Sequence, residues 1–414
     1  MFQQASRSAV LVALLFAAGV AAIAHARQPA LEVMRLDGQT EVGSLVRLVP
    51  EVSLEVAGGV ISLPWSEILA IRPSDASPSS QPSTANPQPL QATLADGSVL
   101  AGEVTAGDQY GFTFRFGEGE ECRLELSQVC VIRALAASAA AEQKLSELLR
   151  LRKDQPGAEP AEDHVTDVAV VARGSEVLVL NGRILEVQPQ QVAFEWKGTQ
   201  RPIPWNRLGG LIFARPELRR APCIVRLNTG DAIAGQVVGG ASGVLKLRMA
   251  VLERELDIPW ASVERVDCRS ERLVVLSDLQ PAGYEFEPFF DKNWNYAVDR
   301  TLTGRQIRLG GRAFARGLSM HSRARLVYQL DGQFERFAAT AGILDEMGGR
   351  GCVTLRVRGD GRVLWSATGV RGGEPPRDVS VDIAGVRELS LEVDYDADLD
   401  LSDQAAWGFA RLIR

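Results

Sequence analysis

The residues that could do chemistry stand mostly in the last third of this 414-residue sequence, in predicted turns between short strands. Acidic residues are numerous there, as the pair Asp345-Glu346 and the run from Asp394 to Asp403. Hydrolysis of a glycosidic bond needs two carboxyl groups held about 5 to 10 Å apart across a cleft. These acids fall in short predicted loops, and no other region of the sequence predicts a catalytic fold. We therefore expect a protein that is not an enzyme.

The acidic run could instead bind a metal ion. Asp396, Asp398 and Asp400 place carboxylates two residues apart, and carboxylate oxygens are ligands that Ca²⁺ takes in proteins. The run lacks the fixed glycine and the terminal bidentate glutamate of an EF-hand loop, which excludes that motif. Two interpretations stay open, a structural Ca²⁺ and a solvated acidic loop. No other cofactor is predicted.

Aromatic residues and a histidine are the candidates for binding a sugar, because the flat face of an indole matches the apolar face of a pyranose ring. Trp294 lies in a polar stretch, residues 291–296, where packing explains it poorly. Trp407 precedes a terminal strand, so it could equally belong to the core. His321 could hydrogen-bond a sugar hydroxyl or lie buried between a strand and a loop. Further polar candidates are Arg316, Arg323 and Glu346.

Hydrophobicity with a period of two predicts strands around these residues. One strand has Leu326, Tyr328 and Leu330 on a single face and ends at the turn Asp331-Gly332. Short strands that recur about every ten residues, with no helical stretch between them, predict an antiparallel sandwich. The same alternation is found at residues 353–358, 379–383 and 389–393.

Residues from about 276 to 414 also carry motifs whose order and spacing resemble a known family. These motifs are Leu276-Ser277-Asp278-Leu279, Asn293-Trp294, Asp299, residues 309–314, residues 316–322, residues 328–332, residues 334–337, the 341–349 loop, residues 357–361 and Trp407. The segment is similar to the novel putative carbohydrate-binding module, NPCBM. The resemblance implies a jelly-roll β-sandwich of the galactose-binding-like kind, often attached to secreted glycosidases and cell-surface proteins. It also implies that a glycan or polysaccharide is the partner.

The segment departs from the family pattern in two places. Family members usually end in an acidic-His-Ala-Asp-Trp run, which here reads Asp403-Gln404-Ala405-Ala406-Trp407. Family members also tend to have adjacent acids after Gly-Ile, whereas here Leu344 precedes Asp345 and Glu346. Both changes fall where polar contacts to a ligand or an ion could lie. Two alternatives therefore remain, a scaffold that binds cell-surface proteins without binding sugar, and an accessory subunit of a glycosidase assembly.

The net charge and the N-terminal segment of the chain narrow these interpretations. A formal net charge of −7 argues against a nucleic-acid surface, which needs basic clusters. Residues 1–26 predict a signal peptide, with an apolar run over residues 9–23 and Ala24-His25-Ala26 as the cleavage site. A retained membrane anchor is the alternative, although the run is shorter than the usual span of about 20 residues. We expect export to the periplasm, the cell surface or the medium, with no span after cleavage.

The five cysteines of an exported protein can form two pairs and leave one over. Cys122 and Cys130 lie close in sequence, and Cys223 and Cys268 bracket one repeat. Pairing within each couple would leave Cys352. The sequence contains no Cys-x-x-Cys motif and only three histidines, so a zinc site is not expected.

Four repeats of about 45 residues precede the predicted sandwich, which takes residues 271–414. They cover residues 31–72, 90–133, 164–215 and 222–269. Each predicts five short strands, and the generic pattern resembles SH3-like or Sm-like barrels. Turns are expected at Asp37-Gly38, Asp96-Gly97, Asn181-Gly182 and Gly230, because glycine adopts positive φ at little cost.

Three of the repeats carry a Pro-Trp pair before the last strand, at Trp65, Trp205 and Trp260, with Ser127 in that place in the second repeat. Such residues could stack on sugars, but recurrence at one register favours tryptophans that plug their own units. The repeats then act as a stalk or scaffold.

Two linkers separate the repeats. Residues 73–89 predict a flexible tether. Residues 134–163 predict a helix as far as Lys153, with Leu145, Leu148, Leu149 and Leu151 at helical spacing, followed by a disordered acidic stretch.

Overall fold

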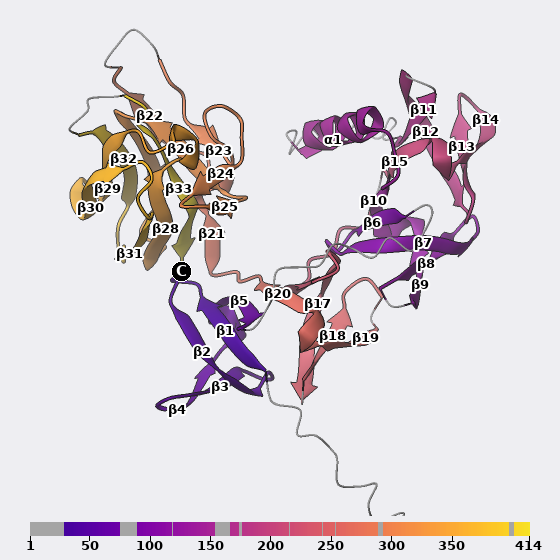
Figure 1. The fold of residues 1–414 in the computed structure, drawn as a ribbon, viewed down its shortest axis with the longest axis horizontal. Helices are drawn as coiled ribbons and strands as arrows, with labels where there is room; N and C mark the ends of the chain where they lie inside the picture. The colour runs from indigo at the N-terminus through magenta and orange to yellow at the C-terminus, as the bar shows by residue number, and fades with distance from the viewer. Residues whose placement is uncertain are drawn as a thin grey trace, which may run out of the picture. The chain divides into compact units, whose positions relative to one another are not determined.

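A computed structural model describes residues 29–74, 89–117, 119–153, 166–173, 176–214, 216–241, 243–252, 254–288, 293–396 and 401–414. The predicted signal peptide, most of the 73–89 tether and the 154–163 stretch lie outside these residues. The described chain consists of antiparallel strands with one α-helix, so the all-β class is confirmed (Figure 1). It divides into two units, one made mainly of the repeats and one mainly of residues 269–414.

Each repeat contains five strands. The first four form a meander, and the fifth returns to pair with the first. The strands are β1 (Ala30–Arg35), β2 (Thr40–Arg47), β3 (Val52–Val56), β4 (Gly59–Leu63) and β5 (Ile68–Pro73); β6 (Leu90–Leu94), β7 (Val99–Gly107), β8 (Gly111–Phe116), β9 (Glu120–Glu125) and β10 (Val129–Ala134); β11 (Asp167–Arg173), β12 (Glu176–Val187), β13 (Gln191–Trp196), β14 (Thr199–Pro204) and β15 (Leu208–Ile212); β16 (Cys223–Leu227), β17 (Ala232–Ala241), β18 (Val244–Met249), β19 (Glu255–Pro259) and β20 (Val263–Cys268).

The predicted turns are found in three repeats, where Gly38, Gly97 and Gly230 have φ of +94°, +95° and +89°. The turn predicted at Asn181-Gly182 is wrong, because both residues lie inside β12, where Gly182 pairs with Asp167. A Cβ on Gly182 would come 2.0 Å from the carbonyl oxygen of Glu195 on the neighbouring strand. Glycine is therefore needed there for close approach of two strands, not for a turn.

The repeats join in pairs through their fifth strands. β5 of the first repeat pairs with β20 of the fourth, and β10 of the second pairs with β15 of the third. Buried polar groups connect the second repeat to the fourth: Asp231 accepts the N–H of Ala101 at 2.6 Å, and the Ser98 hydroxyl accepts the N–H of Ala234 at 2.9 Å. Buried polar groups need such partners, and here they fix how the repeats assemble.

Two of the three Pro-Trp tryptophans plug their own repeats, whereas Trp65 is half-buried. Trp205 and Trp260 are each 3% exposed and begin 3₁₀ turns at Trp205–Arg207 and Trp260–Ser262. The indole of Trp205 donates to the carbonyl of Gln188, and that of Trp65 to Leu48, both at 2.9 Å. The expectation that these residues serve packing is confirmed for Trp205 and Trp260, which present no open face.

The predicted helix is α1 (Ala139–Lys153), and it packs on the third repeat. Leu145 is fully buried against Val168, Val170 and Ile212, whereas Leu151 is exposed. Among the described residues no helix combines the length and the hydrophobicity that a membrane crossing requires.

The C-terminal unit is a sandwich of two antiparallel sheets. One sheet has the order β23-β26-β33-β28-β31, with β21 also paired to β33, and the other has the order β22-β27-β32-β29-β30. A β24–β25 hairpin lies outside both sheets. The bounds are β21 (Leu273–Val275), β22 (Gly283–Phe286), β23 (Ala297–Val298), β24 (Ile307–Leu309), β25 (Arg312–Phe314), β26 (Gly317–His321), β27 (Ala324–Gln329), β28 (Arg336–Ile343), β29 (Cys352–Gly359), β30 (Arg362–Arg371), β31 (Arg377–Asp382), β32 (Glu388–Tyr395) and β33 (Gln404–Ile413).

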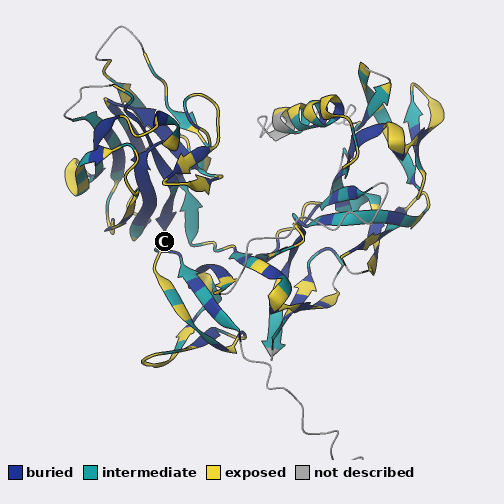
Figure 2. Ribbon diagram, in the orientation of Figure 1, coloured by how far each residue is buried: buried dark blue, intermediate teal, exposed yellow. Residues whose placement is uncertain are grey.

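A single hydrophobic core fills the sandwich, and the inward faces of both sheets contribute to it (Figure 2). Tyr328 and Leu355 contribute from one sheet, and Phe337 and Trp407 from the other. The same unit includes residues 34–40 and 66–69, and the Arg411 guanidinium of β33 donates to the carbonyl of Leu36 at 2.8 Å. Residues 271–414 therefore do not make up the whole of this unit.

Candidate functional site

An aromatic stack lies at the end of the sandwich where β26 finishes. The indole of Trp294 lies parallel to the imidazole of His321, with ring centroids 5.1 Å apart and 4° between the planes. Trp294 is half-buried, so part of its ring system reaches the surface, whereas His321 is 5% exposed. Two of the predicted site residues thus meet, with the histidine beneath the tryptophan.

Neighbouring aromatic residues hold this stack in place. Phe286 meets the imidazole edge-on at 6.5 Å, and the Tyr284 ring lies 5.1 Å from that of Tyr296. The Tyr284 hydroxyl donates to the carbonyl oxygen of Trp294 at 2.9 Å, which fixes the backbone of the loop that carries the indole. Burial raises the pKa of Tyr284 to about 12, so this hydroxyl keeps its proton at neutral pH.

The imidazole beneath Trp294 has a defined orientation. Nδ1 of His321 lies 2.7 Å from the carbonyl oxygen of Ser322. A carbonyl oxygen only accepts hydrogen bonds, so Nδ1 carries a hydrogen. The burial of His321 makes it a support for the indole; it does not present an open imidazole to a ligand.

A buried polar network lies beside the stack. Asp403 is fully buried, and its carboxylate accepts the Ser322 hydroxyl and the N–H of Cys352, both at 2.9 Å. Gln404 follows it and stands opposite His321 in the β26–β33 ladder. The side-chain oxygen of Gln404 is buried and accepts no hydrogen bond from the described residues. This glutamine occupies the position at which the NPCBM resemblance leads us to expect a histidine.

Arg316 lies away from the stack. It precedes β26, and His321 ends β26, so about 15 Å of extended chain separates the two residues. The Arg316 guanidinium pairs with Asp278 and, at 3.2 Å, with Asp299. These contacts give Arg316 a structural role at the opposite end of the strand.

Trp407 has no accessible face. It is fully buried, and its ring meets Phe337 and Trp365 edge-on at 6.4 and 6.1 Å. Of the two interpretations of Trp407, the structure supports the one that places it in the core. The stacking role expected of it is not possible in this conformation, because a sugar would have to displace the sandwich core.

Glu346 and its neighbour Asp345 are engaged in holding loops. The Glu346 carboxylate accepts the Thr303 hydroxyl at 3.0 Å, and Arg305 lies 3.7 Å away. Asp345 accepts the N–H groups of Gly310 and Gly311 at 2.7 and 2.8 Å. Asp345 therefore fixes the turn of the β24–β25 hairpin, and Glu346 fixes the loop that precedes it.

Arg323 follows the stack directly in sequence and is exposed. Its guanidinium pairs with Glu287 at 3.0 Å and lies 3.7 Å from Asp394. Arg323 thus belongs to a series of ion pairs on the second sheet. In that series Asp394 also pairs with Arg356 at 3.0 Å.

The expected calcium site lies largely outside the described residues, which exclude Asp398 and Asp400. Asp396 is described, and its carboxylate accepts the Thr354 hydroxyl at 2.8 Å and the N–H of Gly369 at 2.9 Å. Across the described ranges, no group of three or more His, Cys, Asp and Glu residues is placed to hold a metal ion.

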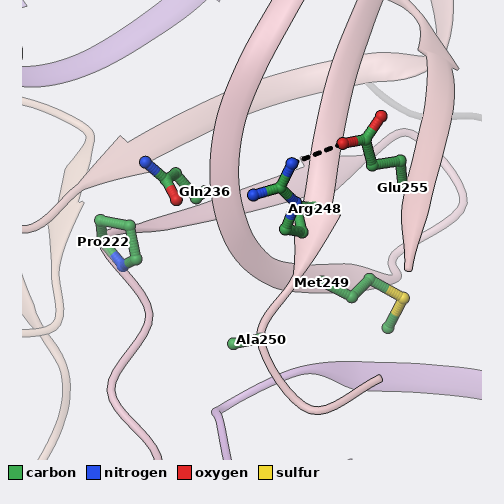
Figure 3. A pocket seen from close by; sticks show the side chains of 6 residues that line it. All are labelled: Pro222, Gln236, Arg248, Met249, Ala250 and Glu255. Atoms are coloured by element: carbon green, nitrogen blue, oxygen red, sulfur yellow. Dashed lines mark hydrogen bonds and ion pairs between the residues drawn. The ribbon is translucent and has the colours of Figure 1, made fainter. Parts of the chain in front are cut away.

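A pocket of about 770 Å³ lies in the fourth repeat. In Figure 3 the side chains of Arg248 and Glu255, partners in the β18–β19 ladder, point toward each other and form an ion pair of 2.7 Å. Gln236 and Met249 also line the pocket. The residues that line this pocket include neither an aromatic ring on which a sugar could stack nor a pair of acids. We therefore place the candidate site on the sandwich.

Sequence reasoning missed the aromatic supports Tyr284, Phe286 and Tyr296. The signal was present, since Tyr284 and Phe286 are two residues apart in sequence, and in the strand β22 residues at that spacing point to one face. The contact of Phe286 with His321, 35 residues later, depends on β22 pairing with β27. That pairing cannot be derived from local pattern.

Comparison with known proteins agrees with the resemblance drawn from the sequence. The sequence model of the NPCBM/NEW2 domain matches residues 273–413. A putative endo-alpha-N-acetylgalactosaminidase of Renibacterium salmoninarum is 29% identical over 90 residues, which is 22% of this chain and 6% of that protein. Alpha-1,3-galactosidase B of Akkermansia muciniphila is 29% identical over 114 residues, which is 27% of this chain and 14% of that protein. The chain thus spans a small part of either relative.

Similar solved structures include the CBM51 module of Clostridium perfringens GH95 in complex with methyl-galactose. It is 24% identical, with a TM-score of 0.31, and the match covers 34% of this chain and 99% of that one. The tandem CBM51 modules of a family 98 glycoside hydrolase from Streptococcus pneumoniae are 11% identical, with a TM-score of 0.31, over 92% of this chain and 88% of that one.

Proposed function

We propose that the protein is an exported, non-catalytic glycan-binding protein, in which the sandwich binds sugar and the four repeats act as its stalk. The half-exposed indole of Trp294, braced on His321 inside the segment that matches the NPCBM/NEW2 domain, is the observation that carries this proposal. Binding sites for small ligands combine aromatic plates with a few oriented polar groups. An indole fixed from below loses little freedom when a sugar stacks on it.

The class of sugar follows from the relatives. Both curated relatives are named as enzymes that act on α-linked galactose or N-acetylgalactosamine. We therefore take terminal α-galactosides and α-N-acetylgalactosaminides as the first ligands to test. Arg323, an exposed guanidinium two residues after His321 in sequence, is the candidate to donate hydrogen bonds to sugar hydroxyls.

The absence of catalysis is part of the same proposal. Three acidic side chains of the sandwich accept hydrogen bonds from other groups of the protein. Asp345 accepts from backbone N–H groups, Glu346 from Thr303, and Asp396 from Thr354 and Gly369. A glycosidase instead needs one carboxyl group as acid and another as base or nucleophile, both facing the scissile bond.

A glycan array probed with the full chain tests the proposal, and a parallel assay follows release of nitrophenol from matched nitrophenyl α-galactosides. We expect binding to a subset of galactose-terminated glycans and no release of nitrophenol. The full chain is used because the sandwich unit includes residues 34–40 and 66–69. A folded chain that binds no glycan would contradict the proposal. It would favour the alternative of a protein-binding scaffold, which the Gln404 and Ala406 departures support.

A further inference from the structure

Cys223 and Cys268 face each other across the two strands that close the fourth repeat. Cys223 opens β16 and Cys268 ends β20, and the antiparallel register places the two residues directly opposite. Opposed residues in such a ladder have Cβ atoms about 4.5 to 5.5 Å apart. The Cα separation of opposed residues, about 4.5 to 5.5 Å, lies inside the range that a disulfide spans.

The surroundings of the two thiols agree with this register. Both side chains are buried, 4% and 8% exposed, and they form a hydrogen bond with each other. That hydrogen bond lowers the pKa of Cys223, while donation to Cys223 and burial raise the pKa of Cys268.

No strand ladder opposes the other cysteines in the same way. β9, which carries Cys122, pairs with β8, whereas β10, which carries Cys130, pairs with β6 and β15. Cys352 begins β29 and is opposed by Arg371 in the sandwich. The pairing of Cys122 with Cys130, which sequence proximity allowed, has no support from the strand register.

We propose that Cys223 and Cys268 form a disulfide bond when the exported chain folds. The Cys223 thiolate attacks a disulfide of a protein thiol oxidase or of oxidised glutathione, and one thiolate of the oxidant leaves. The Cys268 thiolate then attacks the Cys223 sulfur of this mixed disulfide, and the second thiolate of the oxidant leaves. The two protein thiols are oxidised by two electrons, and the oxidant is reduced to two thiols that take up the two protons.

The position of the bond gives it a mechanical role. Cys268 is the last residue of the repeat unit, and the chain continues from it into the sandwich unit. β20 also pairs with β5 of the first repeat. If the sandwich binds glycan as proposed, tension on it reaches the repeats at Cys268 as well as through residues 34–40 and 66–69 of the first repeat. The disulfide would hold β20 against β16 at that point, so that this strand does not peel away.

Thiol counting tests the proposal without reference to sugar binding. The full chain is refolded with oxidised and reduced glutathione, denatured, alkylated with iodoacetamide, digested without reductant and analysed by mass spectrometry. We expect alkylation of three of the five cysteines and one cross-linked peptide pair that contains Cys223 and Cys268. Five alkylated cysteines, or a cross-link that joins another pair, would overturn the proposal.

Two variants serve as matched controls. Cys130→Ser should keep the cross-link and lose one alkylated residue, because Cys130 is outside the pair. Cys223→Ser should lose the cross-link and leave Cys268 alkylated. If Cys223→Ser does not fold, the wild-type count still decides the matter, since alkylation is carried out on the denatured chain.

Discussion

Trp205 of the third repeat and Trp294 of the sandwich show how one residue type serves two purposes. In the repeats, Trp205 is closed in on all sides, and its N–H is satisfied by the carbonyl of Gln188. In the sandwich, Trp294 lies half-exposed on the imidazole of His321. In the first arrangement the whole indole is buried and contributes to stability. The second keeps part of the indole at the surface, beside aromatic residues such as Phe286 that also pack against the sandwich core. Leaving part of an indole exposed gives up stability, which is typical of binding sites.

The strongest test of this contrast is removal of a repeat tryptophan. Trp205→Ala should lower the free energy of unfolding of its repeat by about 3 to 5 kcal/mol, the usual cost of truncating a buried indole. Thermal unfolding followed by circular dichroism measures the loss, and glycan binding by the same variant should be unchanged. Trp196→Ala is the matched control, because Trp196 is half-buried in the same repeat beside Lys197 and Arg201. Equal destabilisation by both changes would refute the plug interpretation.

A smaller loss is expected in the polar network that supports the sandwich site. Asp403→Asn replaces one acceptor oxygen with a donor, which then faces the N–H of Cys352 or the Ser322 hydroxyl. Leaving a buried polar group unsatisfied costs about 1 to 3 kcal/mol. Urea unfolding of the sandwich should therefore shift to a lower midpoint. Asp382→Asn, at an exposed position that only caps the N–H of Ala384, should leave the midpoint in place.

The smallest effect concerns Tyr284. Tyr284→Phe removes the hydrogen bond to the Trp294 carbonyl, which is worth about 1 kcal/mol. Burial raises the pKa of Tyr284 to about 12 from its ordinary value near 10. The folded state thus keeps a proton that the unfolded chain releases, so this stability is complete below pH 10 and is lost as the pH rises towards 12.

The difference between wild type and Tyr284→Phe in urea midpoint should therefore shrink between pH 10 and pH 12. Other tyrosines, including buried Tyr328, are common to both proteins and do not affect the difference. A difference that stays constant over this range would show that the Tyr284 proton is not coupled to folding.

The sequence predicts the fold and the candidate site to different extents. Alternation and turn residues predicted the all-β class, and the polar setting of Trp294 singled it out. The strand spacing could also have separated Arg316 from His321, since five residues of strand hold their ends apart. The burial of Trp407 could not be predicted, because β33 is buried on both faces and shows no alternation.

The remaining features depend on contacts between distant strands. His321 lies 27 residues after Trp294, and nothing local to either residue predicts a parallel stack. Asn181-Gly182 has the sequence of a tight turn, but the chain turns earlier, and the glycine is needed for the approach of β13. Tertiary packing overrides local turn preference at that position.

Calorimetric titration of the full chain with the galactoside that binds best on the array tests the central claim most directly. Trp294→Ala should weaken binding roughly 10- to 150-fold, since burying a large apolar side chain yields about 1.5 to 3 kcal/mol. Trp196→Ala in the third repeat should bind like wild type. Full affinity in a folded Trp294→Ala variant would contradict the account, because the sugar would then be bound without the indole on which the proposed site is built.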